Sequence, residues 1–206
     1  MRVGIDFDNT VVSYDELFYR IALERSLVPP DIAPTKLNVR EHLRRAGRED
    51  IWTEMQGYVY GARMQDAQVY PGVIAFLSGA RAAGVSLAIV SHKTRQPFLG
   101  HPYDLHAAAR GWVEEFLMKN ANPLIAADDV YFELTKDAKL ARIDELRLDY
   151  FVDDLPEILL AEGFPDRTGR ILFDPYSTHA RNACLASFSD WGQIGKYLQN
   201  EWKTRS

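Results

Sequence analysis

Short apolar segments alternate with amphipathic ones along most of the chain. Five segments are short, rich in β-branched or aromatic residues and bounded by Gly, Asp or Pro, which predicts β-strands at 2–7, 85–90, 129–132, 150–152 and 170–173. Four others carry apolar residues at helical spacing, at 72–83, 105–119, 137–146 and 156–162. This alternation predicts a mostly parallel sheet, in which ligands bind beyond the carboxyl ends of the strands.

One long segment interrupts the alternation. Residues 12–70 contain no convincing strand and instead show two helical patterns, "YDELFYRIALERSLV" and "EDIWTEMQGYVYGARM", on either side of the Pro-rich connection "PPDIAP". We therefore expect a Rossmann-like three-layer α/β/α core, formed by residues 1–11 and 71–206. Residues 12–70 would form a small α-helical cap that overhangs the carboxyl end of the sheet.

Composition narrows the classes of partner. The 206 residues are 47% hydrophobic and 26% charged, with a formal net charge of -5, which argues against binding nucleic acid or an acidic membrane through a broad basic surface. The single cysteine, Cys184, excludes an intramolecular disulfide and a metal site built from cysteines. No apolar run approaches the length of a membrane span. We expect a soluble, cytoplasmic protein with a small-molecule partner; the oligomeric state is left open.

Polar side chains follow the predicted strands. The first strand runs into "DFDNT", which holds Asp6, Asp8 and Thr10; the second runs into "VSH", which holds Ser91; and the fourth runs into "FVDD", which holds Asp153 and Asp154. The helix before the fourth strand begins with "TKDAK". Because the carboxyl ends of parallel strands lie along one edge, we expect these acids, the hydroxyl and a lysine to converge.

This ordered set resembles the four motifs of the haloacid dehalogenase-like (HAD) hydrolase superfamily, whose commonest members are magnesium-dependent phosphatases. The resemblance covers nearly the whole chain. It implies that Asp6 attacks phosphorus to form an aspartyl-phosphate, and that Asp8 starts protonated, protonates the leaving oxygen and then activates water. Ser91 would donate a hydrogen bond to the phosphoryl group. Lys136 and Lys139 lie one turn apart, and we choose Lys139 as the active-site lysine because its distance to "DD" is closer to that in similar family sequences.

A divalent cation would neutralise the phosphoryl oxygens, and Mg2+ prefers oxygen ligands. By the resemblance, its protein ligands are Asp6, the backbone carbonyl of Asp8, and Asp153, with Asp154 as a direct or indirect support. The expected substrate is a small phosphorylated metabolite. The residues expected to contact it are Phe7, Asn9, Thr10, His92 and Lys93.

Other interpretations exist for the same residues. Taken singly, acids that end a strand and a "DD" pair in a turn are ordinary structural features, and it is their joint order that favours a site. The dehalogenase branch of the superfamily typically lacks the second acid, which is present here as Asp8. A non-catalytic or signalling phosphate-binding module, such as a receiver domain, carries its acids, hydroxyl and lysine in a different order.

Two further clusters have weaker interpretations. Arg40, Arg44, Arg45 and Arg48 in "REHLRRAGR" include several on one helical face that could meet an anionic substrate, although a solvated face is favoured. Three histidines lie in "SHKTRQPFLGHPYDLH", but His101 and His106 lack the i,i+4 spacing of a helical zinc site, so a second metal site is disfavoured. His92, Lys93 and Arg95 are instead expected at the mouth of the site.

Overall fold

A single parallel sheet forms the centre of the protein. The structure is a computed structural model that describes residues 1–119 and 122–205, with side chains described as far as residue 201. The sheet has the strand order β5-β4-β1-β6-β7-β8, and every pairing in it is parallel. Its strands are β1 (Arg2–Ile5), β4 (Ser86–His92), β5 (Val130–Glu133), β6 (Tyr150–Asp153), β7 (Gly169–Phe173) and β8 (Ala186–Phe188).

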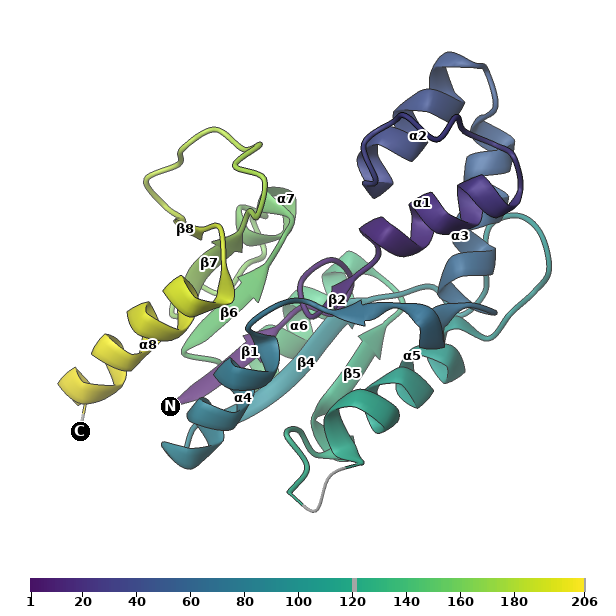
Figure 1. Ribbon diagram of the computed structural model, residues 1–206. Helices are drawn as coiled ribbons and strands as arrows, with labels where there is room; N and C mark the ends of the chain where they lie inside the picture. The colour runs from purple at the N-terminus through teal and green to yellow at the C-terminus, as the bar shows by residue number, and fades with distance from the viewer. Residues whose placement is uncertain (120–121, 206) are drawn as a thin grey trace.

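Helices cover both faces of this sheet (Figure 1). Buried side chains divide into two clusters, because successive residues of a strand point to opposite faces. Ile89 of β4 belongs to the larger cluster and Val90 to the smaller one. The larger cluster packs under α4 (Val73–Ala82), α5 (Leu105–Val113) and α8 (Trp191–Arg205), and the smaller under α6 (Lys136–Glu145) and α7 (Pro156–Leu159). The three-layer α/β/α architecture is therefore confirmed.

The segment after β1 leaves the central sheet and returns to it through a short two-stranded ribbon. Val12 of β2 (Val12–Ser13) pairs with Val69 of β3 (Gln68–Val69) in antiparallel register. Between these strands lie α1 (Asp15–Glu24), α2 (Lys36–Arg45), α3 (Glu49–Tyr60) and the 3-10 turn η1 (Met64–Asp66). Figure 1 shows the three helices standing beyond the end of the sheet toward which β4 and β5 point.

The inserted helices share a core with the sheet. Phe18, Trp52 and Leu43 are buried at 0–2% exposure, and they belong to the same apolar cluster as Ile5 of β1. Phe18 and Trp52 have ring centroids 4.9 Å apart. Because this cluster is continuous, the helices are held against the sheet by buried apolar contact as well as by the ribbon.

The sequence pattern missed the shortest elements. β2, β3 and β8 contain two or three residues each, too few for alternation of apolar and polar positions to be visible. The predicted helix over 105–119 is α5 followed by a π-helical turn, η2 (Glu114–Met118), and a 3-10 turn, η3 (Ala127–Asp129), precedes β5. Within the described residues, no helix combines the length and the apolar character that a membrane crossing requires.

Candidate active site

The chain turns sharply after β1. The carbonyl of Phe7 accepts hydrogen bonds from the N–H groups of Val11 and Val12, at 3.1 and 3.0 Å. Asn9 lies within this turn in the left-handed region, at φ 58°, which Asn tolerates better than most residues. The Nε1 of Trp191 donates to the carbonyl of Thr10 at 3.1 Å and ties the turn to α8. The turn thus holds Asp6 and Asp8 at the carboxyl edge of the sheet.

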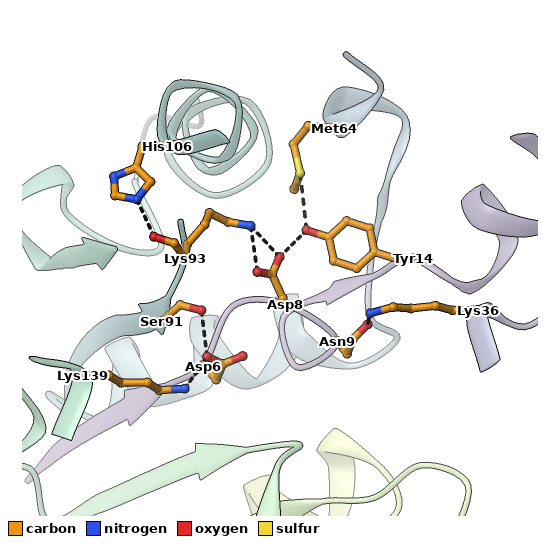
Figure 2. A network of polar contacts seen from close by, with 10 residues as sticks. All are labelled: Asp6, Asp8, Asn9, Tyr14, Lys36, Met64, Ser91, Lys93, His106 and Lys139. Atoms are coloured by element: carbon orange, nitrogen blue, oxygen red, sulfur yellow. Dashed lines mark hydrogen bonds and ion pairs between the residues drawn. The ribbon is translucent and has the colours of Figure 1, made fainter. Parts of the chain in front are cut away.

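Asp6 is held from two sides. Its Oδ1 accepts a hydrogen bond from the Oγ of Ser91 at 2.8 Å and an ion-pair hydrogen bond from the Nζ of Lys139 at 2.6 Å (Figure 2). Asp6 is 5% exposed and Lys139 is 2% exposed. Burial alone would lower the pKa of Lys139, but the charges of Asp6 and Asp153 outweigh it and raise that pKa above its usual value. Lys139 is therefore a buried cation beside Asp6.

Lys136 lies in a different environment from Lys139. Its Nζ pairs with Glu157 at 2.5 Å, and both side chains are more than half exposed. Lys139 instead bridges Asp6 and the Oδ2 of Asp153, the latter at 2.6 Å. Of the two lysines that the sequence offered, Lys139 is the one in contact with the acids, while Lys136 lies at the rim.

Three carboxylates form one group. Asp6, Asp153 and Asp154 each offer an oxygen, and these oxygens lie within 4.8 Å of one another. Asp153 is fully buried, and its oxygens accept from Lys139 and, at 2.9 Å, from the backbone N–H of Leu155. Asp154 is half-buried and lines a cavity of about 90 Å3 that Asp6, Asp8, Ser91 and Lys139 also line. We call this the small cavity.

Burial and mutual repulsion disfavour the charged forms of Asp153 and Asp154. Burial raises the pKa of Asp154 well above its usual range, and the charges of Asp6 and Asp153 raise it further. Burial also raises the pKa of Asp153, against the opposing charge of Lys139. A hard divalent cation would relieve this repulsion, and a donor set made only of carboxylate oxygens suits Mg2+. The residues present therefore fit such an ion, with Asp154 facing the small cavity and Asp153 bound to Lys139.

Asp8 is held by a second lysine. The Nζ of Lys93 lies 2.7 Å from Oδ2 and 3.0 Å from Oδ1 of Asp8, and the hydroxyl of Tyr14 donates to Oδ1 (Figure 2). Burial would raise the pKa of Asp8, but the charge and hydrogen bonds of Lys93, with the hydrogen bond of Tyr14, lower it below its usual value. The sequence predicts a protonated Asp8 at the start of the reaction; in this structure Lys93 favours the ionised form, so that part of the mechanism stays a prediction.

The sequence predicted Lys93 at the mouth of the site, but its side chain is buried. It is 4% exposed, and its carbonyl contacts the Nε2 of His106 at 2.8 Å. Tyr14, which sequence reasoning missed, is 1% exposed. No motif marks Tyr14, since its position beside Asp8 arises only when α1 packs against the turn.

The remaining expected substrate contacts divide into two groups. Asn9 and His92 line the small cavity. The side chain of Phe7 is instead fully buried, in edge-to-face contact with Trp112 and Phe132 at centroid distances of 5.4 and 5.2 Å. Thr10 is fully buried, and its hydroxyl donates to Asp154 at 3.4 Å. The side chains of Phe7 and Thr10 are therefore buried behind the small cavity, and their predicted contact with substrate stays a prediction.

The histidine and arginine clusters noted in the sequence lie in different surroundings. Within the part of the chain that the structure describes, the three acids form the only group of metal-ligating side chains, and none of the histidines joins one. His101 packs on Tyr103, with ring centroids 4.5 Å apart. Arg44 pairs with Glu49 at 2.6 Å on the exposed surface, whereas Arg40 is half-buried.

No protein-family model matches this sequence, and no curated protein matches it significantly. Solved structures do match over nearly the full length. A predicted phosphatase from Clostridium acetobutylicum aligns with a TM-score of 0.59 and 15% identity, covering 97% of this chain and 98% of that one. A HAD family hydrolase from Deinococcus radiodurans with bound phosphate and sodium aligns with a TM-score of 0.56 and 16% identity, covering 97% of this chain and 95% of that one.

A third similar structure has a different name. Protein tyrosine kinase A from Mycobacterium tuberculosis aligns with a TM-score of 0.58 and 18% identity, covering 96% of this chain and 97% of that one. Identities this low establish the fold and not the activity. The chain has the fold of the HAD hydrolases.

Proposed function

We propose that this protein is a Mg2+-dependent phosphohydrolase that acts on a small phosphorylated metabolite through an aspartyl-phosphate on Asp6. The observation that carries the proposal is the environment of Asp6. Its Oδ1 accepts hydrogen bonds from Ser91 and Lys139. Carboxylate oxygens of Asp6, Asp153 and Asp154 lie within 4.8 Å of one another, close enough to bind one metal ion. The HAD fold supports the same conclusion.

The proposed first step is attack by Asp6 on phosphorus. The hydrogen bonds from Ser91 and Lys139 fix the orientation of its carboxylate, and the same two donors are placed to bind oxygens of the phosphoryl group. Mg2+, held by Asp6, Asp154 and the backbone carbonyl of Asp8, would supply the positive charge that lets one anion approach another. Asp153, bound to Lys139, would position that lysine.

Proton transfer falls to the pair formed by Asp8 and Lys93. The ammonium of Lys93 donates to the carboxylate of Asp8, and its charge favours the ionised form of that acid. In the proposed reaction, a proton of this ammonium passes through the Asp8 carboxylate to the oxygen of the leaving group as its bond to phosphorus breaks. Water then attacks the aspartyl-phosphate and returns a proton to the pair, which restores the starting state and frees Asp6.

The direct test is release of inorganic phosphate from an aryl phosphate with and without Mg2+. We expect turnover that is abolished by a chelator and restored by Mg2+. Asp6→Asn should abolish it while the thermal unfolding profile remains cooperative. Asp137→Asn, on an exposed position of α6, is the matched control and should retain wild-type turnover. Wild-type activity in Asp6→Asn would refute the assignment of the nucleophile.

A phosphoryl-binding module without turnover is the second candidate. The fold alone does not separate this candidate from a hydrolase, because one similar solved structure is named a protein tyrosine kinase. A stable phosphate label on Asp6 that is never released to water would identify such a module. Metal-independent release of halide would instead identify a dehalogenase.

A further inference from the structure

A second hollow opens beside the small cavity. This cleft, of about 240 Å3, shares Asn9 and Asp154 with the small cavity. Its other walls come from the start of α2, which contributes Lys36 and Arg40, and from the loop after β7, which contributes Tyr176. We call it the side cleft. A substrate with its phosphoryl group at Asp6 would extend its leaving group into this space.

Arg40 has a buried hydrogen-bond donor without an acceptor. Its Nε is buried, and it is the one buried side-chain nitrogen or oxygen without a hydrogen-bond partner in the described residues. A guanidinium stays protonated throughout the physiological pH range, so Nε keeps its N–H and remains a hydrogen-bond donor. Leaving a buried donor without an acceptor is unfavourable. Arg40 also lines the side cleft, so a ligand bound there would offer acceptors to its guanidinium.

Lys36 lies one turn before Arg40 on the same face of α2. Its Nζ donates to the neutral Oδ1 of Asn9 at 3.1 Å and lies 5.5 Å from the centre of the Tyr60 ring (Figure 2 shows Lys36 reaching Asn9). Burial would lower the pKa of Lys36, but the side chain of Tyr60 and the charges of Asp8 and Asp154 raise it, although no ion pair within 4 Å in the described residues involves this ammonium. Lys36 is thus a half-buried cation without an ion-pair partner.

The acids of the side cleft are already engaged. Asp15 accepts the backbone N–H of Lys36 at 2.7 Å and the hydroxyl of Tyr176. Asp174 accepts the backbone N–H groups of Thr178 and His179, each at 3.0 Å. These two carboxylates fix the walls of the cleft, while Asp154, the third acid of the cleft, acts on Lys36 through its charge, and no ion pair within 4 Å in the described residues involves Lys36 or Arg40.

We propose that Arg40 and Lys36 bind a second anionic group, a carboxylate or a phosphate, on the leaving-group side of the substrate. This inference rests on the proposed function and narrows it to phosphate monoesters that carry a further negative charge. The size of the cleft suits a short carbon skeleton, and Tyr70 and Phe173 give it an apolar wall. Arg40, which the sequence pattern assigned to a solvated face, becomes a specificity residue.

The test compares matched esters. 3-Phosphoglycerate and glycerol 3-phosphate differ by a carboxylate in place of a hydroxymethyl group. Propane-1,3-diol bisphosphate and its monophosphate differ by the second phosphate. We expect kcat/KM to be at least tenfold higher for the ester with the second anionic group in at least one of the two pairs. The pair that shows this preference identifies the anion as a carboxylate or a phosphate.

Variants assign the preference to the side cleft. Arg40→Gln and Lys36→Met should each lower the preference for the charged ester by ten- to a hundredfold. Arg45→Gln removes an exposed arginine from the same helix and should keep the preference intact. Equal kcat/KM within both pairs, or a preference that survives both substitutions, overturns the inference while leaving the phosphohydrolase proposal standing.

Failure of the proposed function is recognised separately. If no ester releases phosphate with Mg2+ present, that proposal fails, and the inference is then decided by equilibrium binding of the same four esters to the wild-type protein. Tenfold tighter binding of a charged ester, lost in Arg40→Gln, supports the anion site. Equal binding of all four overturns it.

Discussion

The ammonium of Lys93 lies 2.7 Å from one carboxylate oxygen of Asp8 and 3.0 Å from the other, in a region where Lys93 is 4% exposed. The two residues are 85 positions apart, one on the turn after β1 and the other directly after β4. This contact changes the role of both. In the proposed mechanism the two residues act together as an acid–base pair, whereas the sequence predicted that Lys93 contacts the substrate.

The first prediction concerns Lys93→Met. Because the lysine stabilises the Asp8 carboxylate and holds the transferable proton, we expect kcat to fall roughly 100-fold or more on every phosphate ester, aryl phosphates included. Without Lys93, burial is less opposed and the pKa of Asp8 rises; since Asp8 alone then carries the proton for the leaving group, the residual activity should fall as pH rises through that pKa. Steady-state kinetics across pH measure both effects.

Lys196→Met, at an exposed position of α8, is the matched control for loss of a lysine and should leave the profile in place. A loss confined to one natural substrate, with aryl phosphates unaffected, would return Lys93 to a role in substrate recognition.

The second prediction concerns Asp154→Asn in the metal-free protein. The raised pKa of Asp154 means that the folded protein keeps a proton that the unfolded chain releases above about pH 4. By linkage, wild-type stability therefore falls as pH rises from that value through the raised pKa. Asparagine removes this dependence, so the variant should be more stable than wild type by about 1–3 kcal/mol at pH 8.

Denaturant unfolding at pH 5 and pH 8 in the presence of a chelator measures this difference. The advantage of Asp154→Asn should be smaller at pH 5, where the wild-type acid is more often protonated. Added Mg2+ should stabilise the wild type and not the variant. A variant less stable than wild type at both pH values would contradict the electrostatic strain inferred for the three acids.

The third prediction concerns Lys139→Met. The substitution leaves Asp6 and Asp153 buried without their common cation, which should cost about 3–5 kcal/mol of unfolding free energy near neutral pH. The cost should shrink at low pH, where the acids are protonated, and added Mg2+ should recover part of it. Lys136→Met removes an exposed pair with Glu157 and should cost less than about 1 kcal/mol. Equal losses in the two variants would be inconsistent with the buried bridge.

The fourth prediction concerns Trp191→Phe. The indole N–H of Trp191 is bonded to the carbonyl of Thr10, within the turn that carries the acids. Its loss should destabilise the protein by about 1–3 kcal/mol and also lower kcat, because the turn loses a fixed support. Trp112→Phe is the control, since its indole bonds the carbonyl of Ala67 at the base of the insertion. A kcat unchanged in Trp191→Phe would mean that the turn is held by its own hydrogen bonds.

The central sheet and the order of the polar residues along its edge could be predicted from the amino-acid pattern. Asp6, Ser91 and Asp153 each belong to a strand end that apolar patterning reveals, and parallel pairing brings those ends together whatever the details of packing. The inserted helical segment was also visible, because helical periodicity replaced short strands over a long stretch.

The pairing of the buried charges could not be predicted in this way, because it depends on how the elements pack. Lys136 and Lys139 are neighbours on one helix, and which of them meets Asp6 depends on how α6 rotates against the sheet. Likewise, Arg40 belongs to an insertion whose position beside Asn9 is set by packing of α2. Periodicity reports which side of an element is buried, whereas the partners of a buried charge are set by contacts between segments far apart in sequence.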